Sequence, residues 1–95
     1  MARGDVKSAI ASIAAAGFQD INPPAGEEWV IHNIYHEAAV TLDFFDGVNS
    51  IPFDSVTGKG IYAKYQFHVK NGVRLRVKND DAAAKLIGYD GIQTK

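Results

Sequence analysis

The sequence predicts an all-β domain, a small antiparallel β-sandwich, and its composition and the spacing of its turns are what predict it. Ile and Val together number 17, whereas Leu numbers 3. Residues branched at Cβ lose rotamer freedom on a helix but pack well on a pleated sheet, and the one Trp, four Tyr and five Phe share that preference. About seven or eight short apolar segments are separated by turn signals roughly ten residues apart, which is typical of a sandwich or a barrel.

Length and charge exclude several classes of protein. A chain of 95 residues is long enough for one domain, residues 1–95, and too short for two. Ten Lys and Arg against eleven Asp and Glu give a net charge of −1, which leaves no basic excess for nucleic acid. The absence of Cys excludes disulfides, thiolate zinc sites and cysteine nucleophiles. No stretch approaches the roughly 20 apolar residues of a membrane span. We therefore expect neither a nucleic acid nor a membrane as partner.

The first segment, residues 5–18, is compatible with a helix or with an extended strand or arm. Val6, Ile10 and Ile13 fall at helical spacing, and Asp5 is a suitable N-cap. The small side chains between them would bury little surface in such a helix, which favours the strand or arm. A signal peptide is disfavoured because charged residues and serines interrupt the apolar stretch.

The middle of the chain has the pattern of strands separated by proline and glycine. The two prolines within residues 22–26 cannot donate to a sheet and mark a connection. Residues 27–37 follow with apolar side chains on both alternating faces, so we expect a strand that is covered on both sides. Residues 40–45 form the next strand. Pro52 interrupts the short strand at residues 51–53 and places it at a sheet edge.

The clearest alternation lies between residues 61 and 77. Apolar side chains occupy the odd positions of residues 61–69 and again of residues 73–77, and mostly polar ones lie between them. Each of these two strands is therefore predicted to have one buried and one solvated face. A last strand is expected over residues 85–92.

The turn between these two strands can be predicted from their register, provided that they pair directly. A two-residue loop would place Val69 opposite Arg74, whereas a three-residue loop, Lys70–Gly72, places Val69 opposite Val73. We therefore predict a type I turn with a bulge, in which Gly72 adopts the left-handed backbone conformation.

No pattern of catalytic, cofactor-binding or metal-binding residues is present in the sequence. His32 and His36 lie four residues apart, but in a strand their rings would be separated by about 13 Å, too far to share an ion. Residues 58–60 lack the upstream glycine and the Ser or Thr of a phosphate loop. We expect no catalytic residue, no cofactor and no metal.

A small basic strip is predicted on the polar side of the alternating strands. Arg74 and Arg76 lie there with His68 and Lys64 of the neighbouring strand. We interpret this strip as a solvated face or as a docking surface for an acidic protein. Tyr62 is the one aromatic residue beside it, which is too little stacking surface to favour single-stranded nucleic acid.

Two consecutive phenylalanines offer the best sign of a subunit interface. Phe44 and Phe45 must point in opposite directions in a strand, so one of them can remain outside the core of so small a domain. The candidate contact residues are Phe44, Phe45, Tyr62, Arg74 and Arg76.

Three segments resemble small virion proteins of tailed phages. They are residues 23–35, which begin Pro-Pro-Ala-Gly-Glu-Glu-Trp, and residues 75–79 and 87–91. The likeness covers residues 10–95 and is to the jelly-roll-like head decoration, or cement, proteins. It implies a non-enzymatic β-sandwich that braces the outside of a capsid, made in the host cytoplasm and located on the virion. It also implies that the partners are the major capsid protein and other copies of the chain, with a homotrimer favoured. A tail or fibre component is the alternative location.

The N-terminal segment takes on a role in this interpretation. Residues 1–18 lack the bulky pattern of a core element and would be an arm that orders on a partner. The alternative from a different class is a carbohydrate- or ligand-binding β module, in which an exposed Trp29 or Tyr62 stacks on the ligand. Burial of Trp29 would remove the main residue of that alternative.

Overall fold

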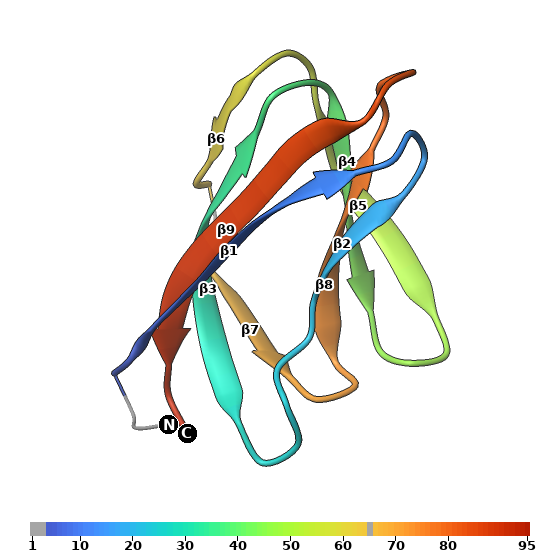
Figure 1. Cartoon of the computed structure of the whole chain (residues 1–95). Coiled ribbons are helices and arrows are strands. Elements are labelled where there is room, and N and C mark those ends of the chain that lie inside the picture. The colour runs from blue at the N-terminus through green and yellow to red at the C-terminus, as the bar shows by residue number, and fades with distance from the viewer. Residues whose placement is uncertain (1–3, 65) are drawn as a thin grey trace.

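Two antiparallel sheets pack face to face in the computed structural model, which describes residues 4–64 and 66–95 (Figure 1). Sheet A has five strands, in the order β1-β9-β3-β6, with β7 also paired to β3. Sheet B has four strands, in the order β2-β8-β4-β5. The predicted all-β sandwich is confirmed. The strands are β1 (Val6–Ile13), β2 (Phe18–Ile21), β3 (Glu28–His36), β4 (Val40–Phe45), β5 (Ser50–Val56), β6 (Gly60–Tyr62), β7 (Phe67–Lys70), β8 (Arg74–Asn79) and β9 (Lys85–Gln93).

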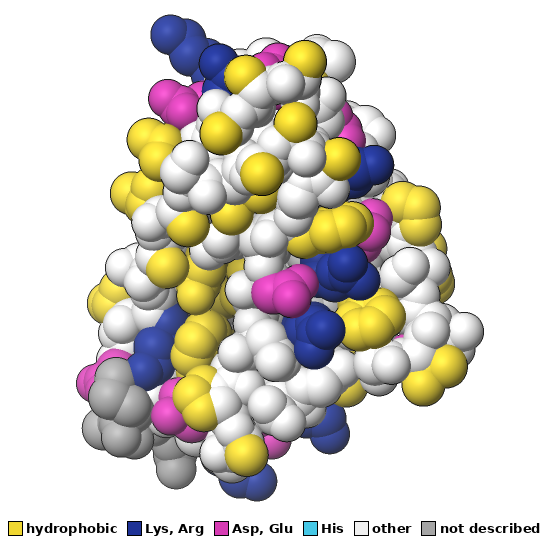
Figure 2. Space-filling model, turned by 45° about the vertical axis from the view of Figure 1, so that its right-hand side comes forward, with side chains coloured by type: hydrophobic (Ala, Val, Ile, Leu, Met, Phe, Trp, Pro, Cys, Tyr) yellow, Lys and Arg dark blue, Asp and Glu magenta, His cyan; other side chains and the backbone are white. Residues whose placement is uncertain are grey.

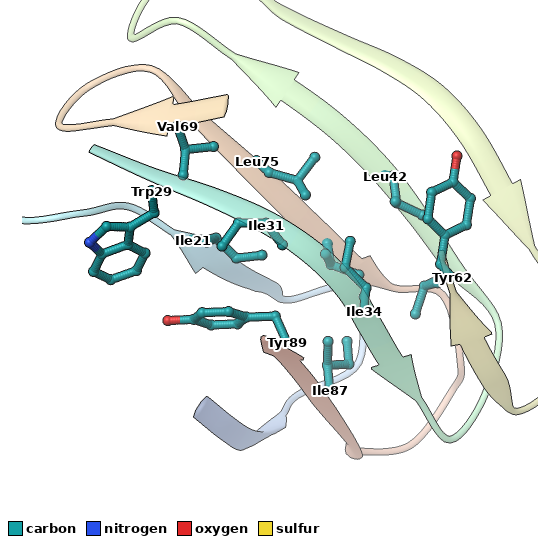
Figure 3. Packing of buried hydrophobic residues seen from close by; sticks show 12 residues of the cluster. Ile21, Trp29, Ile31, Ile34, Leu42, Tyr62, Val69, Leu75, Ile87 and Tyr89 are labelled. Atoms are coloured by element: carbon teal, nitrogen blue, oxygen red, sulfur yellow. The ribbon is translucent and has the colours of Figure 1, made fainter. Parts of the chain in front are cut away.

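The core lies between the two sheets and is built by period-two alternation (Figure 3). Ile31 and Ile34 of β3 are completely buried, and so are Leu42 of β4 and Leu75 of β8. These branched side chains fill the space between the sheets, at the usual separation of about 10 Å. The remaining buried apolar residues are Ile21, Trp29, Val40, Tyr62, Val69, Val77, Ile87 and Tyr89.

The surroundings of β3 differ from the prediction for residues 27–37. Its apolar residues on both faces predicted that it would be covered on both sides. Sheet B covers only the inner face, which carries Ile31 and Ile34, while Val30 and Tyr35 on the outer face are partly exposed. The outer face of sheet A is therefore apolar without being covered by another layer.

The N-terminal segment is a strand and not a free arm. β1 pairs with β9 along its whole length, from Val6 opposite Ile92 to Ile13 opposite Lys85. The helix alternative is wrong, because alternate residues of β1 face the sandwich and Ile13 packs against the core. The arm is corrected for residues 6–13, which belong to sheet A. Residues 1–3 of the expected arm lie outside the described residues.

The expected hairpin between β7 and β8 is also corrected. β7 pairs with β3 in sheet A, whereas β8 pairs with β2 and β4 in sheet B. Only Lys70 and Val73 form a bridge, and their backbone groups bond to each other across a two-residue turn. Val69 therefore does not pair with Val73. Gly72 does adopt the left-handed conformation that was predicted, with φ of +90°.

The alternation at residues 61–69 has the opposite phase at its start. Ile61 is 62% exposed, whereas Tyr62 is 3% exposed and lies in the core. β6 ends at Tyr62 and β7 begins at Phe67, so the chain changes phase in the connection between them. Tyr65 of that pattern lies outside the described residues. Pro52 lies in β5, at the edge of sheet B, as predicted.

Candidate interaction surface

The outer face of sheet A carries a group of apolar side chains, which we call the bare face: Val6, Ile10, Tyr35, Ile61, Leu86 and Ile92. Val6 and Ile10 of β1 are 73% and 72% exposed. The register places Val6 beside Ile92 of β9 and places Tyr35 of β3 beside Ile61 of β6. The bare face thus extends across four neighbouring strands. Several exposed apolar side chains on one face mark an interaction site more often than isolated exposed side chains do.

A hollow of about 210 Å³ lies within the bare face, lined by Ile10, Tyr35, Leu86 and Gly88 among others. Gly88 is part of this lining and has no side chain to fill the hollow. A Cβ atom at Gly88 would lie 2.8 Å from Cγ1 of Ile10, so the Ile10 side chain leans over this glycine. The surface is therefore uneven, and a complementary side chain could enter it.

The polar groups in the middle of the bare face bond to one another. The Tyr35 hydroxyl donates to Oδ2 of Asp90 at 2.6 Å, and Nδ2 of Asn33 donates to Oδ1 of the same carboxylate at 2.9 Å. The hydrogen bond to Asp90 is the main reason that the pKa of Tyr35 is raised. The Asp90 carboxylate thus accepts hydrogen bonds from two neighbours on the same face, which meets part of its hydrogen-bonding capacity within the chain.

β1 forms one border of the bare face and leaves its backbone open. The Gln93 N–H donates to the Asp5 carbonyl at 2.9 Å, which sets the phase of the ladder between β1 and β9. Odd-numbered residues of β1 bond toward β9, so the backbone groups of the even-numbered residues from Val6 to Ser12 point away from the sheet.

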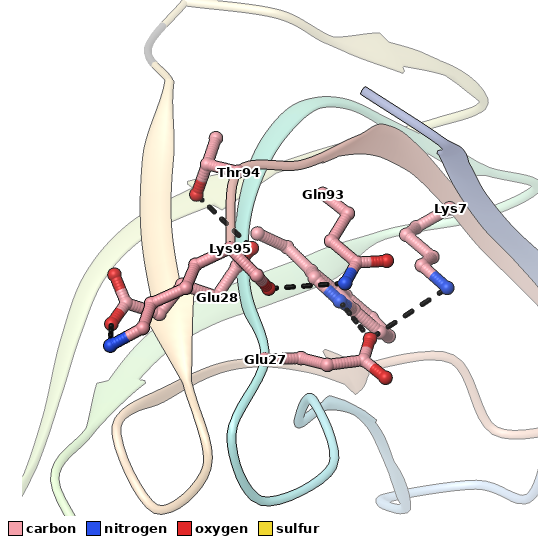
Figure 4. Close-up of polar contacts among 7 residues, drawn as sticks. Lys7, Glu27, Glu28, Gln93, Thr94 and Lys95 are labelled. Atoms are coloured by element: carbon pink, nitrogen blue, oxygen red, sulfur yellow. Dashed lines mark hydrogen bonds and ion pairs between the residues drawn. The ribbon is translucent and has the colours of Figure 1, made fainter. Parts of the chain in front are cut away.

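The single charge of β1 is held inside the molecule (Figure 4). The Lys7 side chain is 11% exposed, and its Nζ lies 3.7 Å from Oε1 of Glu27. It also lies 5.5 Å from the centre of the Trp29 ring, whose Nε1 donates to the same Glu27 oxygen at 3.0 Å. Lys7 is thus neutralised beneath the sheet and places no charge on the open edge.

The outer face of sheet B has a different construction, which we call the arginine–aromatic ladder: Phe18, Asp20, Phe45, Arg74 and Arg76. The Arg76 guanidinium lies 4.0 Å from the centre of the Phe18 ring and 4.8 Å from that of Phe45. Arg74 lies 4.7 Å from Phe45. Nε of both arginines faces Oδ1 of Asp20, at 3.3 Å from Arg76 and 3.9 Å from Arg74.

Figure 2 shows cationic and anionic side chains lying between hydrophobic ones on this side of the molecule. The arrangement changes the interpretation of the basic strip. Asp20 faces both arginines, and Asp43, 9% exposed, pairs in register with Arg76. His68 lies on β7 in sheet A, and Lys64 lies 3.6 Å from Asp54 of β5, so neither extends the arginine pair. A basic strip made of all four residues is therefore wrong.

The predicted phenylalanine pair diverges as expected. Phe44 is opposite Leu75 on the inner side of β4 and is 39% exposed at the end of the sandwich. Phe45 is opposite Arg74 on the outer side, under the guanidinium groups. Of the five predicted contact residues, the structure brings together Phe45, Arg74 and Arg76. It separates Phe44 from them, and it buries Tyr62.

Both stacking residues of the ligand-binding alternative are buried. Trp29 is 9% exposed and stacks on Tyr89 at a centroid distance of 6.4 Å. Tyr62 packs against Phe67 and donates its hydroxyl to Asp54. An aromatic platform needs an exposed ring, so this alternative loses the two residues on which it rested.

The histidines do not converge on an ion. His36 is 6% exposed, and its Nδ1 bonds to the carbonyls of Gly58 at 2.9 Å and Ala38 at 3.2 Å. Across residues 4–64 and 66–95, no group of three or more His, Asp or Glu side chains is arranged to hold a metal.

Comparison with known proteins gives no relative: no family model matches this chain, and no curated protein matches it. In the part of the chain that the structure describes, no helix is long and apolar enough to cross a membrane.

Sequence reasoning missed the bare face. Val6 and Ile10 share their side of β1 with Ser8 and Ser12, so the strand has no clean apolar stripe. The available signal was in β3, whose outward Val30 and Tyr35 were apolar in addition to its inward residues. That signal predicted a cover, and residues 4–64 and 66–95 do not provide one.

Proposed function

We propose that this chain is a non-enzymatic structural protein that self-associates and braces a protein shell, as a decoration or cement protein of a phage head. The bare face is the observation that carries the proposal. It leaves aliphatic side chains of three strands, β1, β6 and β9, exposed to water, and contact with other proteins would bury them. A domain of 95 residues has a thin core, so contacts with neighbouring subunits add to its stability.

The assignment to a virion is supported by the resemblance of residues 23–35, 75–79 and 87–91 to small tailed-phage proteins. The bare face suits this role because a shell offers a repeated protein surface. A self-associated pair of copies can contact two sites of the shell at once, so that weak contacts reinforce one another. The major capsid protein is the proposed shell partner.

Co-sedimentation with empty shells tests the proposal. The gene for a major capsid protein is sought beside the gene for this chain, and shells of that capsid protein are mixed with the purified chain. We expect the chain to pellet with the shells in a fixed stoichiometry. Pelleting with purified tails or fibres instead would place the chain on the tail or fibre and not on the head. Binding to none of these particles would overturn the proposal.

A matched pair of variants tests the surface involved. Leu86→Lys places a charge on the bare face, on β9 and not on the edge strand β1 itself, and is expected to weaken shell binding at least about tenfold, since an apolar contact worth about 1.5 kcal/mol or more is lost. Val48→Lys is the control, because Val48 is 85% exposed in the turn between β4 and β5. Equal binding by both variants would exclude the bare face as the shell contact.

A further inference from the structure

We infer that β1 is the docking edge for a second copy of this chain, so that two copies pair β1 with β1 in antiparallel fashion about a two-fold axis. Sheet A then continues from one copy into the other. The inference rests on the self-association proposed above and names its partner strand and its symmetry.

The four borders of the two sheets differ in how they are protected. The edge strands β2, β6 and β7 are only four, three and four residues long. β5 is longer, but it contains Pro52 and its pairing with β4 is shifted by a bulge. Short strands, proline and bulges are the usual means of preventing edge-to-edge pairing. These borders are therefore poor templates for another chain.

β1 has none of these protections. It is eight residues long, contains no proline, and pairs with β9 without a register shift. The backbone groups of its even-numbered residues point outward. These residues are two aliphatic residues, Val6 and Ile10, and two serines, Ser8 and Ser12. A long and regular edge with free backbone groups is a template for pairing with another strand.

The charges permit contact between identical copies. A two-fold axis places each charge of β1 near its own copy, so an exposed lysine would repel itself across the interface. Lys7 is instead paired with Glu27 beneath the sheet. The net charge of −1 per chain also produces little repulsion between two copies.

One register makes β1 complementary to itself. Centring the axis on Ser8 places the two Ser8 residues opposite each other and places Val6 of each copy opposite Ile10 of the other. The even-numbered residues then form the hydrogen-bonded pairs, as their outward backbone groups require. Two apolar cross-strand pairs flank one pair of hydroxyl groups, which is a favourable combination.

This symmetry has a consequence for the bare face. An axis perpendicular to the sheet keeps both outer faces on the same side of the dimer. Val6 and Ile10 of the two copies meet at the joint, so the two bare faces form one surface. The dimer would present a doubled apolar surface to a shell. This contact closes after two copies, so it predicts a dimer and not the trimer that the resemblance favours.

The first test is the dissociation constant of the free chain, measured by sedimentation equilibrium of the full protein without shells. Ile10→Lys is expected to raise it at least about tenfold, because the axis repeats each change and removes two Ile10 contacts. Val48→Lys is the matched control and should leave the dissociation constant unchanged. A monomer at all concentrations, a trimer, or equal dissociation constants in the two variants would overturn the inference.

The second test fixes the register by cross-linking. The chain has no Cys, so a single introduced Cys can form only an intermolecular disulfide. Opposed residues of a hydrogen-bonded pair have Cα atoms about 5.5 Å apart, within the range that a disulfide spans. Ser8→Cys should therefore form a covalent dimer on mild oxidation.

Ser12→Cys is the control, since Ser12 is also exposed on the same strand but lies far from its own copy in this register. Equal cross-linking of the two variants, or none by Ser8→Cys, would overturn the register centred on Ser8. Shell binding is measured in a separate experiment. A monomeric chain that still binds shells would refute the β1 dimer and the proposed self-association but not shell binding, and a dimer that binds no virion particle would refute only the proposed shell binding.

Discussion

The outer faces of the two sheets differ in how their apolar side chains are covered. Each has apolar side chains that the core does not take up. On sheet B, Phe18 and Phe45 lie under the guanidinium groups of Arg74 and Arg76, and Asp20 lies beside both cations. On sheet A, Val6 and Ile10 have no such cover and are among the most exposed apolar residues.

The difference shows which face the chain completes by itself. A guanidinium group can lie on an aromatic ring and still contact water. The arginine–aromatic ladder therefore covers the outward rings of sheet B with side chains of the same chain. Aliphatic side chains attract no cation in this way. The bare face can be covered only by apolar groups from elsewhere, which is why it carries the functional proposal.

The largest expected effect comes from the close backbone packing beneath the bare face. The strands of sheet B contain no glycine, whereas β9 of sheet A contains Gly88 and Gly91. A Cβ atom at Gly91 would lie 2.1 Å from the Val30 carbonyl oxygen and 2.8 Å from Cα of Ile31. Gly91→Ala must therefore force β9 away from β3. We expect a loss of about 3 kcal/mol or more in the free energy of unfolding, measured with urea.

Gly88→Ala is the comparison for that variant. Its Cβ atom would lie 2.8 Å from the Ile10 side chain, which can turn aside, and 3.0 Å from the Ala9 carbonyl oxygen. The expected loss is smaller, about 1 kcal/mol, and it should be accompanied by weaker association because Ile10 moves. If Gly91→Ala were as stable as the parent chain, sheet A would not be as closely packed as the structure has it.

The second effect measures how much the arginine cover contributes to sheet B. Arg76 lies against two rings and Arg74 against one. Cation–π contacts contribute about 0.5–2 kcal/mol depending on exposure. We expect Arg76→Ala to lower the free energy of unfolding by about 1–2 kcal/mol and Arg74→Ala by about 0.5–1 kcal/mol.

Two further variants separate stacking from charge in the same urea experiment. Lys78→Ala removes a cation from the same face of β8 and should change stability by less than about 0.5 kcal/mol. Arg76→Lys keeps the charge but loses the planar group, so it should recover only part of the loss. Equal losses in the Arg76, Arg74 and Lys78 alanine variants would mean that the rings contribute nothing.

The sequence predicted the fold class and some local geometry because these depend on local patterns. The excess of Ile and Val over Leu indicated sheets, and Pro52 indicated an edge. Gly72 was assigned a positive φ because the turn needs it. Alternation shows which side chains share a face, but it does not show which sheet a strand joins. Val69 and Leu75 are both buried, yet they lie on strands of different sheets.

The candidate surfaces were predicted only in part for the same reason. Arg74 and Arg76 were chosen from their spacing in β8. The ring of Phe18, more than 50 residues earlier in the chain, is brought beneath Arg76 only because β2 pairs with β8. Likewise, Val6 and Ile10 become part of an apolar surface only when β1 pairs with β9. Long-range pairing, and not composition, creates both surfaces.

The smallest expected effect lies where the two sheets meet at their far edges. The Tyr62 hydroxyl of β6 in sheet A donates to Oδ2 of Asp54 of β5 in sheet B at 2.8 Å. This hydrogen bond is the main reason that the pKa of Asp54 is lowered in the folded chain. A carboxyl group whose pKa is lowered by folding stabilises the fold above its unfolded pKa, and that contribution is lost as the pH falls through the folded pKa.

Tyr62→Phe should therefore raise the pKa of Asp54 toward its ordinary value and reduce the loss of stability between about pH 4 and pH 2. The measurement is the carboxyl carbon shift of Asp54 by NMR, followed through an acid titration of both chains. Asp46 is an internal control, because its pKa is lowered by backbone N–H groups of Asn49 and Val48 and should not change. An unchanged pKa of Asp54 would show that this hydrogen bond does not join the two sheets in solution.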